Sequence, residues 1–188
     1  MPTIRPLLSL LALAALATLA ACGDDDSLPD PTQENFVDTV TVGSLTDTPV
    51  TTPSGFSVSE GAVRTDLNAG FDFAYDIQGT AESGQTVILP RAALGITSGN
   101  SAEPGVMRRD EAFDEIEAAP SNGYVTEEAV PVALGEVYIV RSRIVCNLGV
   151  PQYAKVEVIG LEDNSLILKV LANLNCGYRG LEPGFPDR

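Results

Sequence analysis

Short runs that alternate apolar and polar residues fill the C-terminal third of the chain, and they constrain the fold more than any other feature. In residues 153–161, Ala154, Val156 and Val158 fall on one face and Lys155 on the other. Residues 165–172 alternate in the same way, and residues 162–164 form a tight turn between the two runs. A period of two is typical of strands with one buried face, so this region predicts an antiparallel hairpin.

Further runs predict strands over residues 36–42, 71–77, 85–89 and 136–145. Residues 95–107 are rich in Gly, Ser, Thr and Asn and predict a long loop, while residues 108–118 predict one short helix capped by Asp110. With 17 Gly and 13 Pro, the chain has ample turn residues between these segments. The expected fold class is therefore all-β: a single sandwich-like antiparallel β domain with at most one short helix.

The N-terminus has the pattern of a secretory signal. Arg5 precedes an apolar run over residues 7–19, which is too short to span a hydrocarbon core of ~30 Å. The run ends in Leu19, two alanines and Cys22, followed by Gly23 and three aspartates. This arrangement resembles the bacterial lipoprotein box, in which the Cys is lipidated and becomes the first residue. An ordinary signal peptide with an incidental Cys is the alternative.

The domain organisation follows from that signal. We expect a signal peptide over residues 1–21, an acidic lipid-proximal tether over 22–35, and an all-β domain over 36–188. The membrane partner would be reached through lipid on Cys22, and Asp does not directly follow this Cys. By resemblance to the usual sorting rule, the predicted location is the outer membrane of the cell envelope, with the domain facing the periplasm or the cell exterior.

Composition excludes several function classes. The chain has no His, which removes Ser-His-Asp triads and His ligands for metal or haem. Its formal net charge of −15 argues against nucleic acid as a partner, because a polyanion would be repelled. Asp72 and Asp76 lie at i and i+4 of one strand, roughly 13 Å apart at ~3.3 Å per residue, too far for a catalytic carboxylate pair. We expect a protein that is not an enzyme.

Cys146 and Cys176 remain once Cys22 is assigned to lipid. In an exported, oxidising compartment such a pair is most simply a disulfide. The alternatives are two separate thiols or a metal pair, although two Cys without His or a CxxC spacing make a poor zinc site.

The order of the segments resembles the HmuY-like family of bacterial outer-membrane haem-binding lipoproteins, over about residues 36–175. The similarity rests on an aromatic-acidic strand, a Gly/Asn-rich loop, a short Asp/Phe passage that ends in Gly-Tyr, and two late strands. These correspond to residues 71–77, 95–105, 112–124, 137–141 and 153–158. The resemblance implies a lipid-anchored, almost entirely β domain, and it implies haem as a ligand.

The residues that would hold such a ligand depart from the family. Family members bind iron through axial His, or in some relatives Met, and here Met107 is the only Met outside the signal. Arg108 and Arg109 could meet haem propionates. The possible second contacts are the tyrosines, with Tyr124 among the candidate site residues beside Tyr75, Tyr138, Tyr153 and Tyr178. The alternative is that Met107 is an ordinary apolar side chain and that the two arginines are solvated or paired with Asp110 and Glu111.

Two functions follow. The first is a lipid-anchored, non-catalytic envelope binding protein, for haem or another small hydrophobic ligand. The second is a structural or protein-interaction lipoprotein of the envelope with no small ligand. A concave pocket with inward polar groups near residues 95–125 would favour the first, and a filled region there would favour the second.

Overall fold

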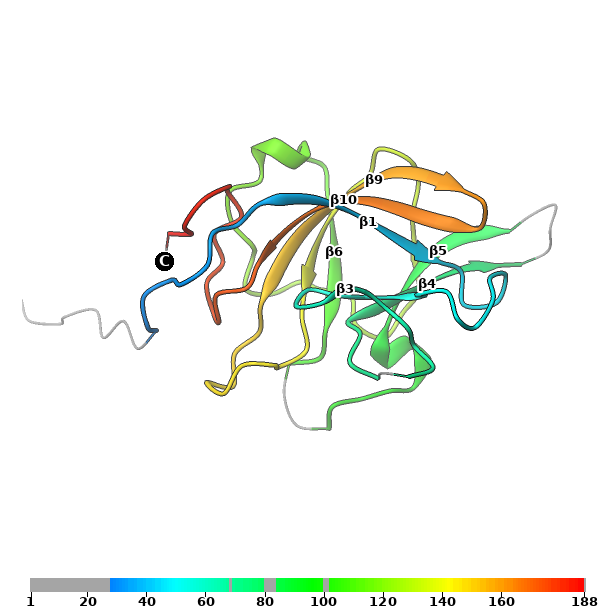
Figure 1. Cartoon of the computed structure of the whole chain (residues 1–188), viewed down its shortest axis with the longest axis horizontal. Coiled ribbons are helices and arrows are strands. Elements are labelled where there is room, and N and C mark those ends of the chain that lie inside the picture. Colours follow the sequence, from blue (N-terminus) through cyan, green and yellow to red (C-terminus); the bar gives the residue numbers. More distant parts are fainter. Residues whose placement is uncertain (1–27, 68, 80–83, 100–101, 188) are drawn as a thin grey trace, which may run out of the picture.

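The computed structural model describes residues 28–67, 69–79, 84–99 and 102–187, and Cys22 and the predicted signal lie outside them. Two five-stranded sheets, antiparallel throughout, form the domain (Figure 1). The first has the order β1 (Val37–Gly43), β10 (Ser165–Asn173), β9 (Tyr153–Glu162), β8 (Val137–Arg141), β6 (Gly105–Arg109). The second has the order β3 (Gly61–Val63), β2 (Gly55–Ser57), β4 (Phe73–Gln78), β5 (Gln85–Pro90), β7 (Val130–Pro131).

The main core lies between the sheets, as expected for a β sandwich. Ala154, Val156 and Val158 of β9 are fully buried in it, and so is Leu168 of β10. Phe56 stacks on Phe73 across the β2–β4 pair, with ring centroids 5.0 Å apart. The alternation in residues 153–161 and 165–172 thus predicted the inner face correctly, and the all-β class is confirmed.

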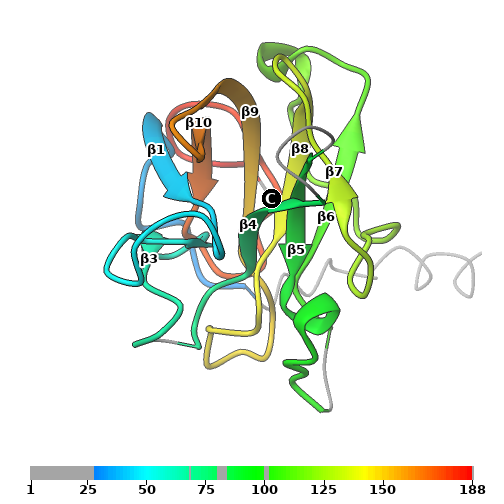
Figure 2. The same ribbon diagram turned by 90° about the vertical axis from the view of Figure 1, so that its right-hand side faces the viewer.

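The β9–β10 hairpin turns where predicted. Asp163 and Asn164 both have positive φ, 50° and 57°, which is the geometry of a two-residue type I′ turn. The first sheet continues through β8 and β6 on one side and β1 on the other, and Figure 2 shows β1, β10, β9 and β8 following one another.

Two local predictions are wrong. Residues 108–118 do not form a helix: Arg108 and Arg109 end strand β6, and only a 3-10 turn, η2 (Phe113–Glu115), follows. Nor is the whole of 95–107 a loop, because β6 begins at Gly105 and pairs with β8 over five residues. The second 3-10 turn, η1 (Arg91–Leu94), follows β5. The helix was predicted from the spacing of Phe113 and Ile116, which is a weak signal. Pairing of residues 105–109 with β8 outweighs it, because tertiary contacts override local propensity.

A third layer covers the outer face of the first sheet. The layer consists of apolar side chains from two segments. The segment after β6 contributes Phe113, Ile116 and Ala119, and the C-terminal tail contributes Leu181. They pack on outward-facing side chains of the sheet, namely Val137, Ile139, Tyr153 and Leu171. The outer face therefore has its own apolar cluster, separate from the core between the sheets.

The folded unit begins earlier than predicted. Asn175 accepts hydrogen bonds from the backbone N–H groups of Thr32 and Gln33, and it donates one to the carbonyl of Gln33 at 2.8 Å. Tyr178 donates to the carbonyl of Pro29 at 2.8 Å. The described part of the predicted tether, residues 28–35, is thus packed on the C-terminal tail, and Figure 1 places the two segments side by side.

The predicted disulfide between Cys146 and Cys176 is present, with Cα atoms 5.9 Å apart. It joins the loop after β8 to the segment after β10, at the end of the sandwich where residues 28–33 are packed. Among the residues that the structure describes, no helix is long and apolar enough to cross a bilayer.

Candidate functional site

Strand β6 places Met107 and Arg109 on the outer face of the first sheet and Arg108 on the opposite side. Met107 is the cross-strand partner of Ile139 in the outer apolar cluster, whereas Arg108 is opposite Tyr138 of the main core. Arg108 pairs with Glu136 at 3.0 Å, and Arg109 pairs with Glu111. The two arginines therefore leave β6 on opposite faces, and each is paired with a different glutamate.

Tyr124 lies over the same outer face as Met107 and Arg109. Its hydroxyl donates to the carbonyl of Pro120 at 2.7 Å, and its ring lies 6.4 Å from that of Tyr153. Arg109 donates to the sulfur of Met107 at 3.7 Å. Three of the four predicted ligand-binding residues, Met107, Arg109 and Tyr124, are thus in one region, and Arg108 is not.

Arg141 and Arg179 complete this region together with Tyr153, and the sequence patterns missed the two arginines. The Arg141 guanidinium lies 4.7 Å from the centre of the Tyr124 ring, a cation–π contact, and its Nη2 donates to the carbonyl of Glu103 at 2.8 Å. The signal that could have indicated Arg141 is its position opposite Tyr153 on the neighbouring strand. Finding that position requires the register of β8 and β9, which the sequence does not give. We name Arg109, Arg141, Arg179, Tyr124 and Tyr153 the arginine–tyrosine cluster.

Burial raises the pKa of the Tyr124 phenol well above its usual value, and Arg141, Arg179 and Arg109 oppose that rise. Burial also raises the pKa of Tyr153, against the same influence of Arg141 and Arg179. Both phenols therefore stay protonated at neutral pH, and they can act as hydrogen-bond donors rather than as bases.

Met107 is half-buried and contacts residues on both sides of it. Gly123 has φ +94°, and a Cβ on it would lie 2.8 Å from Cε of Met107, so the methionine methyl packs against this glycine backbone. The sulfur already accepts the Arg109 contact. A hollow of about 340 Å³ beside Arg108 and Arg109 is lined by neither Met107 nor a tyrosine. The contacts of Met107 with Gly123 and Arg109 therefore occupy both its methyl group and its sulfur, an arrangement that does not favour Met107 as an axial haem ligand.

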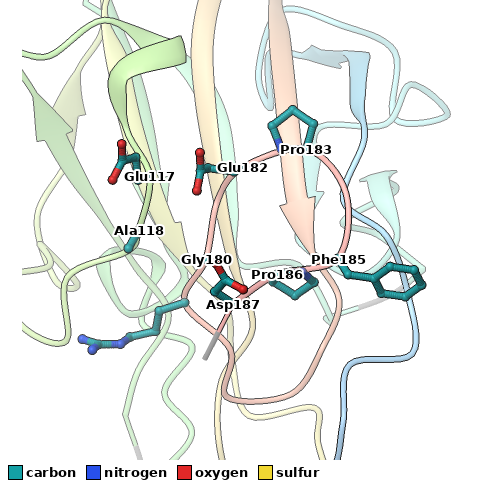
Figure 3. A pocket seen from close by; sticks show the side chains of 9 residues that line it. Glu117, Ala118, Gly180, Glu182, Pro183, Phe185, Pro186 and Asp187 are labelled. Carbon is teal, nitrogen blue, oxygen red and sulfur yellow. The ribbon is translucent and has the colours of Figure 1, made fainter.

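A second hollow, of about 430 Å³, lies between Glu117–Ala118 and the C-terminal tail (Figure 3). Its wall includes the carboxylates of Glu117, Glu182 and Asp187, and the Phe185 ring points away from Glu117 and Ala118. Within the described residues, no group of three acidic or Cys side chains is arranged to hold a metal ion.

The buried ionisable side chains of the described chain have structural partners. The Asp72 carboxylate accepts the N–H groups of Val58 at 2.8 Å and Arg143 at 2.7 Å, and burial raises its pKa to about 6. Asp76 accepts the hydroxyl of Ser44 at 2.7 Å and the N–H of Thr46 at 3.1 Å. These acids tie loops to strand β4 and line none of the hollows described above or below.

A third hollow is an apolar groove of about 200 Å³ that opens between the sheets beside strand β1. It is lined by Phe36, Val40, Val58 and Leu174, among others. Unlike the outer face of the first sheet, this surface has no layer of side chains over it in the described structure, since Phe36 is 67% exposed.

Comparison with family models, with curated proteins and with solved structures finds no match for this chain.

Proposed function

We propose that this chain is a lipid-anchored, non-catalytic protein of the bacterial envelope, at the outer membrane, that works by binding another envelope protein. The observation that carries the choice is the packing of the segment after β6 on the first sheet. Phe113, Ile116 and Tyr124 pack into the outer apolar cluster, and neither Met107 nor a tyrosine lines the hollows beside this segment. That arrangement supports a protein-interaction role over the binding of haem or another small ligand there.

The placement of the buried ionisable side chains supports a non-catalytic role. Asp72, Asp76 and Lys155 are buried and hydrogen-bonded to loops, so none is free to reach a substrate. The phenols of the arginine–tyrosine cluster have raised pKa values, so they stay protonated at neutral pH and cannot accept a proton there. The resemblance to the HmuY-like family stays a prediction.

The anchor would hold the domain close to the membrane. Leu28, the first residue that the structure describes, packs near Gly177, and six residue steps separate it from Cys22. A fully extended chain of that length reaches at most about 20 Å. Lipid on Cys22 would therefore keep the tail and disulfide end of the sandwich beside the bilayer.

Two measurements test this proposal. Metabolic labelling with a radioactive fatty acid, followed by fractionation, should place the wild-type chain in the membrane fraction with label, and Cys22→Ser should remove both. Titration of the detergent-purified full chain with haemin should give no saturable Soret shift. A soluble, unlabelled wild type would contradict the anchor, and a saturable shift abolished by Met107→Ala would restore the small-ligand function.

A further inference from the structure

The groove beside β1, which we name the edge groove, is lined by seven apolar side chains: Phe36, Val40, Phe56, Val58, Val170, Ala172 and Leu174. It exists because the second sheet is short at this end. Strands β2 and β3 have three residues each and cannot cover the whole inner face of β1. Burial along β1 shows this directly, since Val42 is fully buried, Val40 is half-buried and Phe36 is exposed.

The rim of the edge groove is acidic. Glu34, Asp38 and Glu60 line it, and no Lys or Arg does. Glu60 is half-exposed and makes one long ion pair with Arg143 at 3.6 Å, which leaves most of the negative charge at the rim uncompensated. Such a rim attracts a cationic partner and repels an anionic one.

Strand β1 adds an open backbone edge. Within the described structure it pairs only with β10, so its other edge has no strand partner. Edge strands are often blunted by Pro or Lys, and β1 has neither. An extended segment of another protein can add to such an edge, with backbone hydrogen bonds for affinity and side-chain pockets for specificity.

We propose that the edge groove docks an extended segment of a partner protein in which Lys or Arg stands two residues before and two residues after one apolar side chain, on the same face of the added strand. The apolar residue enters the groove, the cations meet Glu34, Asp38 and Glu60, and the backbone pairs with β1. The volume of about 200 Å³ favours a single side-chain anchor, because small-molecule sites are typically about 300–1,000 Å³. This inference names the surface and partner chemistry for the proposed protein-binding function, and it rests on that function.

The test uses the full chain purified in detergent and a fluorescent heptapeptide in which four threonines alternate with lysine, phenylalanine and lysine, so that the two lysines and the phenylalanine share one face of the strand. Fluorescence anisotropy should show saturable binding, and the same peptide with Glu in place of Lys should not bind. Hydrogen exchange should show protection of the β1 amides when the lysine peptide is bound. Unchanged exchange of β1 in the bound state would overturn strand addition.

Two variants separate docking in the groove from general attraction to an acidic protein. The triple variant Glu34→Gln, Asp38→Asn, Glu60→Gln should weaken binding by about fivefold or more, since each exposed pair contributes up to about 1 kcal/mol. The matched control is Asp110→Asn, Glu127→Gln, Glu128→Gln, which removes the same charge at exposed sites elsewhere and should leave binding nearly unchanged. Equal losses in both would overturn the proposal.

Ala172→Phe tests the apolar anchor, because the larger side chain fills the groove. Phe36→Ser tests it in a second way, by removing an apolar side chain at the exposed end of the groove without adding volume. Each should reduce peptide affinity while thermal unfolding stays cooperative. Peptide binding at wild-type affinity in both variants would overturn the proposal. A concentration-dependent dimer that competes with the peptide would also overturn it, if sedimentation shows that Ala172→Phe abolishes the dimer. Peptide binding does not depend on lipid, so its failure leaves the labelling and fractionation result for Cys22 unaffected.

Discussion

The ammonium group of Lys155 donates a hydrogen bond to the backbone carbonyl of Ile116, with Nζ and O 2.9 Å apart. Lys155 is only 2% exposed, and its Nζ lies 4.7 Å from the centre of the Phe113 ring. The sequence pattern placed this lysine on the outward face of β9, which is correct, but that face is covered by the segment after β6. Lys155 therefore ties this segment to the sheet instead of pointing to solvent.

Replacing Lys155 by Ala should destabilise the domain by about 1–3 kcal/mol, because the carbonyl of Ile116 loses its donor and Phe113 loses a packed neighbour. Denaturant unfolding of wild type and variant measures the difference. Lys169→Ala is the matched control, since Lys169 also lies over the Phe113 ring but is part of exposed ion pairs with Asp114 and Glu157. A larger loss in the control would contradict the assigned role of Lys155.

Asp72 should make stability fall as pH rises from about 4 to about 6. Burial raises its folded pKa from 3.8 to about 6, so the unfolded chain releases this proton at lower pH than the folded chain does. The stabilisation is complete below the unfolded pKa and is lost as pH rises through the folded pKa. A shift of about two units corresponds to about 3 kcal/mol.

The comparison with Asp72→Asn isolates this effect from the other carboxylates. The unfolding free energy of wild type minus that of the variant should decrease by about 2 kcal/mol between pH 4 and pH 7, measured by urea unfolding at several pH values. The variant also loses one of the two backbone acceptor bonds to Val58 and Arg143, which shifts its stability by a constant amount. A difference that is flat with pH would show that Asp72 keeps its ordinary pKa.

Asn175 should decide whether residues 28–35 belong to the folded unit. Its side chain is 6% exposed and makes three hydrogen bonds to the backbone of Thr32 and Gln33. Asn175→Ala should make this segment open more often, because buried backbone groups lose their partners. Limited proteolysis should then cut within residues 28–35 several-fold faster than in wild type. Equal rates would mean that the segment is held by other contacts.

Part of the candidate site could be predicted and part could not. Met107, Arg109 and Tyr124 were chosen from residue chemistry, and they do lie together on the outer face. Arg108 was grouped with Arg109 because they are adjacent in sequence. In a strand, adjacent side chains point to opposite faces, and the prediction of a helix at this position concealed that divergence.

Strands β2, β3 and β7 were not predicted, because two or three residues are too few to show a period. These short strands nevertheless decide where the edge groove opens. The acidic stretch before β1 was predicted to be solvated for a related reason: its charge is local information, whereas its partners Asn175 and Tyr178 lie more than a hundred residues away. Long-range hydrogen bonds leave no signal in local composition.

The sequence alone determined the all-β class, the hairpin of the last two strands and the chemistry of the Cys146–Cys176 pair, because each depends on local periodicity, turn residues or redox context. Only the tertiary structure decided which faces are covered. Alternation identifies the two faces of a strand but not what covers them. Lys155 is buried because the segment after β6 packs on the outer face of the first sheet, and Phe36 is exposed because the second sheet does not extend over it.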